Sequence, residues 1–474
     1  MNAAQQLSTD DLNTLQQSFE QQKKHFLQQP FLNYAQRIER LDKLYNAIVK
    51  YESEIVVAIS QDFGNRSHTE TRLFEIVSVL SAIKYCKKNL KKWMKPQKRE
   101  VSLMFQPGAC HVLYQPLGVI GIVVPWNYPL VLSLGPLIQV IAAGNQAMIK
   151  MSEYSPNFSV VLNKLISENF SSNEIKVFNG DAQFAQAFTE LPFDHLVFTG
   201  ATAIAKHVLH AAAENLTPVT LELGGKSPAI ISSSADVEDA AARIAFGKSV
   251  NSGQTCIAPD YVIVHQNIKN EFVQHYLKAL QQFYPEGLTD NPDATSIINE
   301  RQYQRLHHYL DDAKNKQGKI TNFNQSIDPK KLSHFVVEEV TDDMKIMQEE
   351  IFGPILPVKT YQSIDEVIHY INDKPRPLAL YYFGYDADEQ HKILHRTHSG
   401  GVSINETLLH AGQDDMPFGG VGHSGMGHYH GYEGFLRFSH AKSVFVKSKL
   451  SVMRKVYPPY NKPIHQLIQK LFLR

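Results

Sequence analysis

The sequence predicts an α/β protein with more than one domain. Short apolar or β-branched runs alternate with helical segments from about residue 117 to 222, and a second series runs from Ile230 to about Leu408. This alternation favours parallel sheets joined by right-handed helical crossovers. A chain of 474 residues is long enough for two or three domains with sizeable cores. Its 43% hydrophobic and 20% charged residues are typical of a globular protein.

The elements are predicted in order along the chain. Between residues 8 and 90, apolar residues such as Leu12, Leu15 and Phe19 recur at helical spacing, and residues 101–115 alternate weakly as in an extended arm. The first α/β series predicts strands at 117–124, 146–150, 175–179, 195–198 and 219–222, and helices at 131–143, 160–170, 182–190 and 201–213. The second predicts strands at 261–264 and 379–383 and a helix at 270–283. Glycines are too frequent in 417–434 for a regular element.

Charge and cysteine content restrict the class of protein. Lys+Arg and Asp+Glu both number 47, so no net positive field favours nucleic acid, and we expect no nucleic-acid partner. Three cysteines in so long a chain argue against a disulfide scaffold and for a reducing compartment. Residues 1–11 lack a basic region followed by an apolar run, so no signal peptide is visible. We therefore expect a cytoplasmic protein.

Two segments raise the question of a membrane. Residues 101–149 contain no Asp, Glu, Lys or Arg, but prolines and amides interrupt the run, which favours a buried core over a membrane span. The tail from Pro463 to Phe472 has apolar residues at helical spacing and predicts a short amphipathic helix. We expect this helix to dock on the body or on a neighbouring subunit; a membrane-surface contact is the alternative.

Cys256 and Glu222 carry the most informative chemistry. Cys256 is the last residue of the polar run Val250–Cys256, which contains Gly253 and suits a reachable thiol better than a core residue. A thiolate is a strong nucleophile, and a carboxylate can act as a base toward water. The 34-residue interval does not by itself bring the two side chains together in space.

Seven motifs in order link the chain to a known family. They are Pro125–Pro129, Lys150–Glu153, Phe198–Gly200, Leu221–Lys226, Gly253–Cys256, Glu349–Pro354 and Pro417–Gly425. With them, the chain resembles the aldehyde dehydrogenase superfamily across nearly its whole length. Residues 424–431 and 457–460 resemble the class 3 branch, which includes fatty, aromatic and bacterial coniferyl aldehyde dehydrogenases.

The resemblance implies roles for three residues. Cys256 would be the nucleophile that forms a thiohemiacetal and then a thioester, Asn127 would stabilise the oxyanion, and Glu222 would activate the hydrolytic water. The implied reaction is NAD(P)-dependent oxidation of a hydrophobic aldehyde to a carboxylic acid. A CoA-acylating enzyme is one alternative, although such relatives commonly lack the carboxylate at Glu222. A silent structural member of the fold is the other, and it should have lost one of the three residues.

The resemblance also implies a nucleotide site. Lys150 and Glu153 would hold the adenosine ribose, and Glu153 would repel a 2′-phosphate, which favours NAD, although class 3 members can accept NADP. The other cofactor-binding residues implied are Trp126, Thr199, Gly200, Glu350 and Phe352. The chain departs from the family by having Met151 after the lysine and Ala205 in place of a second glycine. No metal is expected, because the histidines near His428 lack accompanying carboxylates or thiols at ligand spacing.

The resemblance further implies the architecture and the substrate class. We expect a Rossmann-like cofactor domain (1–101 and 119–221), an α/β catalytic domain (222–414), a small β oligomerisation arm (102–118 and 415–448) and a C-terminal tail (449–474). A homodimer is expected, as for class 3 relatives. Tyr128 is expected to line the substrate tunnel. Composition does not separate a fatty from an aromatic aldehyde, and coniferyl aldehyde is a candidate by similarity alone.

Overall fold

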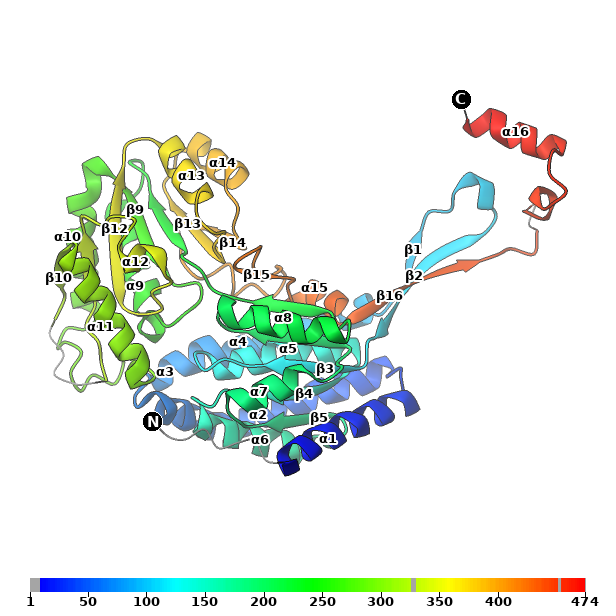
Figure 1. The fold of residues 1–474 in the computed structure, drawn as a ribbon, viewed down its shortest axis with the longest axis horizontal. Helices are drawn as coiled ribbons and strands as arrows, with labels where there is room; N and C mark the ends of the chain where they lie inside the picture. Colours follow the sequence, from blue (N-terminus) through cyan, green and yellow to red (C-terminus); the bar gives the residue numbers. More distant parts are fainter. Residues whose placement is uncertain (1–8, 325–329, 451–452, 474) are drawn as a thin grey trace.

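The computed structural model describes residues 9–324, 330–450 and 453–473. Two α/β lobes lie side by side, and a β arm projects from one of them and carries the C-terminal helix at its far end (Figure 1). The described residues form one sheet of six strands, one of seven and one of three.

The six-stranded sheet is the centre of the first lobe. Its strand order is β15-β7-β6-β3-β4-β5, and every neighbouring pair is parallel except β15 with β7. The strands are β3 (Val119–Val123), β4 (Gln146–Lys150), β5 (Ile175–Phe178), β6 (His195–Thr199), β7 (Val219–Glu222) and β15 (Gly425–Met426). The α-helices of this lobe are α1 (Thr9–Gln28), α2 (Tyr34–Phe63), α3 (His68–Thr71), α4 (Val77–Trp93), α5 (Pro129–Ala143), α6 (Pro156–Asn169), α7 (Ala182–Thr189), α8 (Thr202–Glu214) and α15 (Gly431–Arg437).

The seven-stranded sheet is the centre of the second lobe. Its order is β10-β11-β12-β9-β8-β13-β14, parallel except for the edge pair β10–β11. The strands are β8 (Pro228–Ile231), β9 (Tyr261–His265), β10 (Lys319–Asn322), β11 (Phe335–Glu338), β12 (Ile355–Tyr361), β13 (Ala379–Phe383) and β14 (Gly401–Ile404). The helices are α9 (Val237–Ser249), α10 (Lys269–Phe283), α11 (Glu300–Asn315), α12 (Lys345–Gln348), α13 (Ile364–Asn372) and α14 (Ala387–Arg396).

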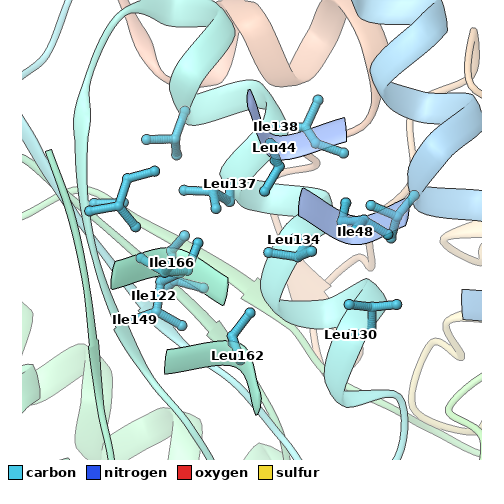
Figure 2. Packing of buried hydrophobic residues seen from close by; sticks show 14 of the residues in the cluster. Leu44, Ile48, Ile122, Leu130, Leu134, Leu137, Ile138, Ile149, Leu162 and Ile166 are labelled. Carbon is cyan, nitrogen blue, oxygen red and sulfur yellow. The ribbon is translucent and has the colours of Figure 1, made fainter. Parts of the chain in front are cut away.

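The core of the first lobe explains the long run without charged residues. Figure 2 shows Leu134 and Leu137 of α5 packed with Leu44 of α2, Ile122 of β3 and Ile149 of β4. Each of these side chains is buried, so a charged residue here would lose its hydration without gaining a partner. No helix among residues 9–324, 330–450 and 453–473 is long and apolar enough to cross a membrane. The prediction of a buried core is therefore confirmed for most of residues 116–149, but it is wrong for residues 101–115, which are exposed or half-buried and lead into the β arm.

The three-stranded sheet forms the arm. It consists of β1 (Gln97–Arg99), β2 (Ala109–Pro116) and β16 (Ser439–Val446), and β16 pairs with β2 in antiparallel register along its whole length. Helix α16 (Pro463–Phe472) lies at the end of the arm, away from both lobes (Figure 1). The predicted amphipathic helix is thus present.

One predicted element is wrong. Residues 417–434 were expected to contain no regular structure, yet β15 pairs there with β7, and α15 begins at Gly431 and contacts α4 and α5. Strand pairing with a segment 200 residues away supplies this order, and no local pattern predicts it. The predicted arm comprises residues 102–118 and 415–448. In the structure, β15 joins the six-stranded sheet instead of the arm, and β1 of the arm precedes residue 102. The division of the chain into domains stays a prediction.

Candidate active site

Four adjacent strands of the six-stranded sheet end at one edge. Glu222 is the last residue of β7, Thr199 ends β6, Lys150 ends β4, and Asn127 follows β3 by four residues. The strands are parallel and neighbours in the order β7-β6-β3-β4, so all four side chains lie at the same edge. The crevice outside the carboxyl ends of parallel strands is where ligands bind in open α/β sheets.

A strained turn from the second lobe presents Cys256 at this edge. Asn251, Ser252 and Gly253 all have left-handed backbone angles, with φ of 51°, 53° and 71°. A side chain at Gly253 would place its Cβ 2.5 Å from the carbonyl oxygen of Gly353, so only glycine fits. Strain of this kind persists where surrounding contacts determine the backbone, as they do next to functional residues.

The buried side chain of Gln254 fixes this turn. Its Nε2 donates to the carbonyls of Asn251 and Ser296, both at 3.0 Å, and its Oε1 accepts from the backbone N–H of Ile298 at 3.0 Å. Three hydrogen bonds from one buried amide hold the backbone just before Cys256. The thiol position is therefore set by the fold before any ligand binds.

Asn127 and Tyr128 are joined directly to the same turn. The side-chain Nδ2 of Asn127 donates to the carbonyl of Gln254 at 3.2 Å, and the Tyr128 hydroxyl lies 2.9 Å from the Thr255 hydroxyl. One N–H of the Asn127 amide is used in that bond, which leaves the other N–H for a further acceptor. The fold thus brings these two predicted residues to the segment that carries Cys256.

A buried ion-pair network supports these residues from behind. Arg66 is wholly buried, contacts Glu75 at 2.7 Å and Glu70 at 3.2 Å, and has its guanidinium 4.7 Å from the centre of the Tyr128 ring. Arg66 also donates to the carbonyl of Asn127 at 3.3 Å, and Glu70 accepts from the backbone N–H of Asn251 at 3.0 Å. The network therefore connects both sides of the site.

Glu222 lies buried, and neither of its carboxylate oxygens has a hydrogen-bond partner among the described residues. Burial raises the pKa of this carboxyl well above its ordinary value. An unpaired buried carboxyl is costly for stability and is typical of a group kept for chemistry.

The surroundings of Cys256 make its thiol hard to ionise in the resting protein. Burial raises its pKa to about 12, and the nearby carboxylates of Glu350 and Glu222 add to the shift. The backbone N–H groups of Cys256 itself and Ile257 act in the opposite direction. The two carboxyl groups therefore lie close enough to the sulfur to affect its ionisation, and a base is needed to form the thiolate at neutral pH.

Cys256 opens into an apolar cavity of ≈ 230 Å³. Tyr128, Val131 and Leu132 of the α5 region line one side, and Phe418 and Tyr429 line another. Burial raises the pKa of the Tyr429 hydroxyl, and the charges of Glu222 and Cys256 raise it further. The Tyr429 ring therefore lies near both groups. The cavity fits a hydrophobic molecule whose reactive end reaches the thiol.

The residues expected to hold the adenosine ribose lie at the end of β4. The ammonium group of Lys150 donates to the carbonyl of Gly180 at 2.6 Å and lies 3.9 Å from the carboxylate of Glu153. Burial lowers the pKa of Lys150, and the charges of Glu153 and Asp181 oppose this. Lys150 is buried, whereas Glu153 is exposed and free to accept hydrogen bonds from hydroxyl groups.

The residues expected near the pyrophosphate lie at the end of β6. The Thr199 hydroxyl has no partner among the described residues, and the N–H of Gly200 donates to the Glu222 carbonyl at 3.0 Å. Helix α8 begins at Thr202, so its first N–H groups face the same edge. Ala205, which replaces the second glycine of the family, is buried in the first turn of α8.

The residues expected at the nicotinamide come from both lobes. The rings of Trp126 and Phe352 meet edge to face with centroids 5.5 Å apart. Glu350 has one buried oxygen without a partner, and a Cβ on Gly224 would lie 2.2 Å from its carboxylate. Burial raises the pKa of Glu350 to about 8. A carboxyl with one unpaired oxygen beside a glycine fits a ligand that donates hydroxyl hydrogens, as a ribose does.

Two parts of the site were not identified from the sequence. Nothing in Gly64–Ser67 marks Arg66 as a buried residue, since its partners lie elsewhere in the chain. Tyr429 was predicted only as part of a glycine-rich motif.

The histidines near His428 pack as structural residues. His430 stacks on Phe418 with ring centroids 5.1 Å apart, and burial lowers the pKa of His430 to about 4. Within the described part of the chain, no three His, Cys, Asp or Glu side chains are grouped as metal ligands would be.

Comparison with known proteins identifies the family. The aldehyde dehydrogenase family profile matches residues 4–444. The "Probable coniferyl aldehyde dehydrogenase" of Pseudomonas aeruginosa is 53% identical over 469 residues, 99% of this chain and 98% of that protein. The "Coniferyl aldehyde dehydrogenase" of a Pseudomonas species is 44% identical over 461 residues, 96% of this chain and 95% of that protein.

Solved structures agree. Substrate-bound AldH of Staphylococcus aureus is 40% identical, with a TM-score of 0.92, over 97% of this chain and 99% of that chain. PnpE in complex with nicotinamide adenine dinucleotide is 25% identical, with a TM-score of 0.85, over 95% of this chain and 92% of that chain. The expected α/β aldehyde dehydrogenase fold with a Rossmann-like domain is confirmed. The chain therefore belongs to the aldehyde dehydrogenase family and is an enzyme that oxidises an aldehyde to a carboxylic acid in an NAD(P)-dependent reaction.

Proposed function

We propose that the enzyme oxidises a hydrophobic aromatic aldehyde, with coniferyl aldehyde giving ferulate, and that Cys256, Asn127 and Glu222 carry the chemistry. The observation that carries the proposal is the position of the Cys256 thiol, which opens into an apolar cavity close to an unpaired buried carboxyl. The names of the two Pseudomonas relatives favour coniferyl aldehyde among aromatic substrates.

Cys256 begins the reaction. Its sulfur adds to the aldehyde carbon, and the thiol proton leaves to solvent water as the C–S bond forms. The carbonyl oxygen then carries the developing negative charge of the thiohemiacetal. The tetrahedral carbon keeps its hydrogen until the next step.

Asn127 stabilises that oxygen. The backbone N–H of Cys256 and the second N–H of the Asn127 amide donate to it, because the first N–H of the amide is held by Gln254. A preorganised donor of this kind contributes on the order of 3 kcal/mol to lowering the barrier. The ion-pair network at Arg66 supports the orientation of Asn127 through its carbonyl.

Glu222 completes the reaction. A bound nicotinamide would supply the acceptor for the hydride of the tetrahedral carbon, and loss of that hydride leaves a thioester on Cys256. Glu222 then takes a proton from a water molecule as that water attacks the thioester carbon, the C–S bond breaks, and the carboxylic acid leaves. The presence of Glu222 supports water over CoA as the acceptor of the acyl group.

We propose NAD as the preferred cofactor. Lys150 and Glu153 would hold the adenosine ribose, Thr199 and Gly200 would lie at the pyrophosphate, and Trp126, Glu350 and Phe352 would lie around the nicotinamide and its ribose. The exposed carboxylate of Glu153 supports this preference, since it can accept from two ribose hydroxyls but repels a 2′-phosphate.

We also propose a cytoplasmic homodimer with the domain division given above. The arm of β1, β2 and β16 supports dimerisation, because its free strand edge and the exposed Phe445 suit pairing with a second chain. Leu467 and Leu471 of α16 are exposed, and docking on the partner would cover them. Light scattering should give twice the mass of the 53.6 kDa chain. A monomer at every working concentration would contradict this part.

A substrate panel tests the proposed function. The enzyme is mixed with NAD and with hexanal, decanal, benzaldehyde or coniferyl aldehyde under reducing conditions, and reduced nicotinamide is followed by absorbance. We expect the highest kcat/KM with coniferyl aldehyde, and ferulate as product with or without CoA. Faster oxidation of decanal would overturn the aromatic preference, and a product formed only with CoA would overturn hydrolysis.

A further inference from the structure

One polar side chain of the substrate cavity has no partner. Gln139 is only 3% exposed, lines the cavity that contains Cys256, and has an Oε1 without a hydrogen-bond partner among the described residues. Its Cγ is held against α15, since a Cβ on Gly434 would lie 2.7 Å from it. The side chain is therefore clamped at its stem, and its amide acceptor is left unsatisfied. A buried acceptor without a partner is uncommon in folded proteins and fits a ligand that donates a hydrogen.

Gln139 lies on the cavity-lining face of α5, farther along the helix from the Cys256 turn than Tyr128. Residues Tyr128, Leu132, Gly135 and Gln139 follow one face of α5 along the cavity. The Tyr128 hydroxyl contacts Thr255, next to Cys256, and eleven residues separate Tyr128 from Gln139, which corresponds to about 16 Å of helix axis. Helical side chains lean toward the helix N-terminus, so the Gln139 amide lies closer to Cys256 than its Cα does. A hydroxycinnamyl aldehyde is an extended molecule, because its phenolic oxygen and its aldehyde carbon lie at opposite ends of a benzene ring and a three-carbon chain. An aldehyde carbon at Cys256 therefore directs the far hydroxyl toward the helix end that carries Gln139.

The same part of the cavity disfavours a negatively charged substrate. Asp414 lines the cavity and accepts from the Ser81 hydroxyl at 2.7 Å, and the Tyr85 hydroxyl donates to the neighbouring Asp415. Burial raises the pKa of Asp414. Asp414 is thus paired with Ser81, and Asp415 with Tyr85. The Gln139 oxygen remains as the unpaired acceptor for a neutral hydroxyl of the substrate. A carboxylate or phosphate at the far end of the substrate would meet like charge.

We propose that Gln139 determines specificity by accepting a hydrogen bond from a hydroxyl group at the far end of the aldehyde. The inference rests on the proposed oxidation of aromatic aldehydes and names the group that selects among them. Aldehydes with a para hydroxyl satisfy the Gln139 oxygen, whereas analogues without it leave the oxygen unpaired. Because the hydrogen bond forms with neutral groups, we expect it to be worth roughly threefold to tenfold in kcat/KM.

The test compares two aldehydes that differ only in that hydroxyl. The ratio of kcat/KM for 4-hydroxy-3-methoxycinnamaldehyde to that for 3-methoxycinnamaldehyde is measured in the wild type, Gln139→Met, Gln139→Asn and Gln146→Met. Gln146 is the matched control, because it is equally buried with an unpartnered Oε1 but does not line the cavity. We expect a ratio of roughly three to ten in the wild type and Gln146→Met, a ratio near one in Gln139→Met, and an intermediate value in Gln139→Asn.

Two results would overturn the proposal. One is a wild-type ratio near one, and the other is a ratio that Gln139→Met leaves unchanged. A measurement on the wild type alone covers the case in which the variants do not fold: ferulate should inhibit several-fold more strongly than 3-methoxycinnamate, and equal inhibition would contradict the hydrogen bond. If the wild type oxidises aliphatic aldehydes but neither aromatic one, the proposed aromatic function fails, and that result is distinct from a lack of discrimination between the two.

Discussion

Replacing Glu222 with glutamine separates the two halves of the proposed reaction. Neither oxygen of the native carboxylate has a partner among the described residues, so the nearly isosteric amide breaks no hydrogen bond that the structure contains. Addition of the Cys256 sulfur and oxidation do not use Glu222 in the proposed mechanism, whereas hydrolysis of the thioester uses it as the base toward water. General-base catalysis contributes about 10²–10⁴-fold. We expect steady-state turnover to fall by that factor while the first equivalent of reduced nicotinamide still forms.

The same substitution should stabilise the protein in a pH-dependent way. Burial raises the folded-state pKa of Glu222 above its ordinary value of 4.5, so the folded state keeps a proton that the unfolded state releases. The wild type therefore loses stability as the pH rises from about 4.5 to the folded-state pKa, by about 1.4 kcal/mol for each unit of pKa difference. Glutamine has no such loss. The melting temperatures of Glu222→Gln and wild type should coincide at pH 4 and separate at pH 7, with the variant higher.

Rapid mixing and thermal melting check both expectations. The wild type, Glu222→Gln and the control Glu214→Gln, which alters an exposed glutamate at the end of α8, are mixed with NAD and coniferyl aldehyde. We expect one equivalent of reduced nicotinamide per site followed by very slow turnover in Glu222→Gln alone. Full steady-state turnover in Glu222→Gln would refute the role of this carboxyl. A variant that melts lower than wild type at pH 7 would refute the inference that the carboxylate is unpaired.

Other substitutions test the remaining roles. Cys256→Ala should form no reduced nicotinamide, even in the first turnover. The variant should still bind added NADH, which is measured as a change in NADH fluorescence. Any burst would mean that another nucleophile acts. Asn127→Ala should lower kcat by about 100-fold, on the order of 3 kcal/mol, with a smaller change in KM, and an unchanged kcat would exclude the oxyanion role. Glu153→Gln should raise kcat/KM with NADP relative to NAD several-fold, because it removes a charge that repels the 2′-phosphate; an unchanged ratio would mean that Glu153 does not contact this part of the nucleotide.

The strands that hold the site were predictable because their signals are local. β4 and β7 have the predicted bounds, and β3 lies within the predicted 117–124, since these short, largely apolar runs end at proline, glycine or charged residues. Helix α5 begins at Pro129, two residues earlier than predicted, because proline suits the first turn of a helix. β15 was missed because its two residues become a strand only by pairing with β7.

The site was predictable in its residues but not in its geometry. Resemblance pointed to Cys256 and Asn127, yet the bond from the Asn127 amide to Gln254 and the left-handed turn at Asn251 follow from contacts between two lobes. Arg66 had no signal in the sequence, because a buried arginine differs from a surface one only in partners that folding supplies. Gln139 likewise stood out only once the cavity was visible.

Mass spectrometry of the trapped intermediate tests the central chemistry most directly. Glu222→Gln is mixed with NAD and coniferyl aldehyde, quenched in acid and digested. The mechanism predicts that the peptide containing Cys256 gains the mass of a feruloyl group in place of hydrogen, and that hydroxylamine removes it as expected for a thioester. An unmodified Cys256 peptide after a full burst of reduced nicotinamide, or an acyl group on Cys86 or Cys110, would contradict it.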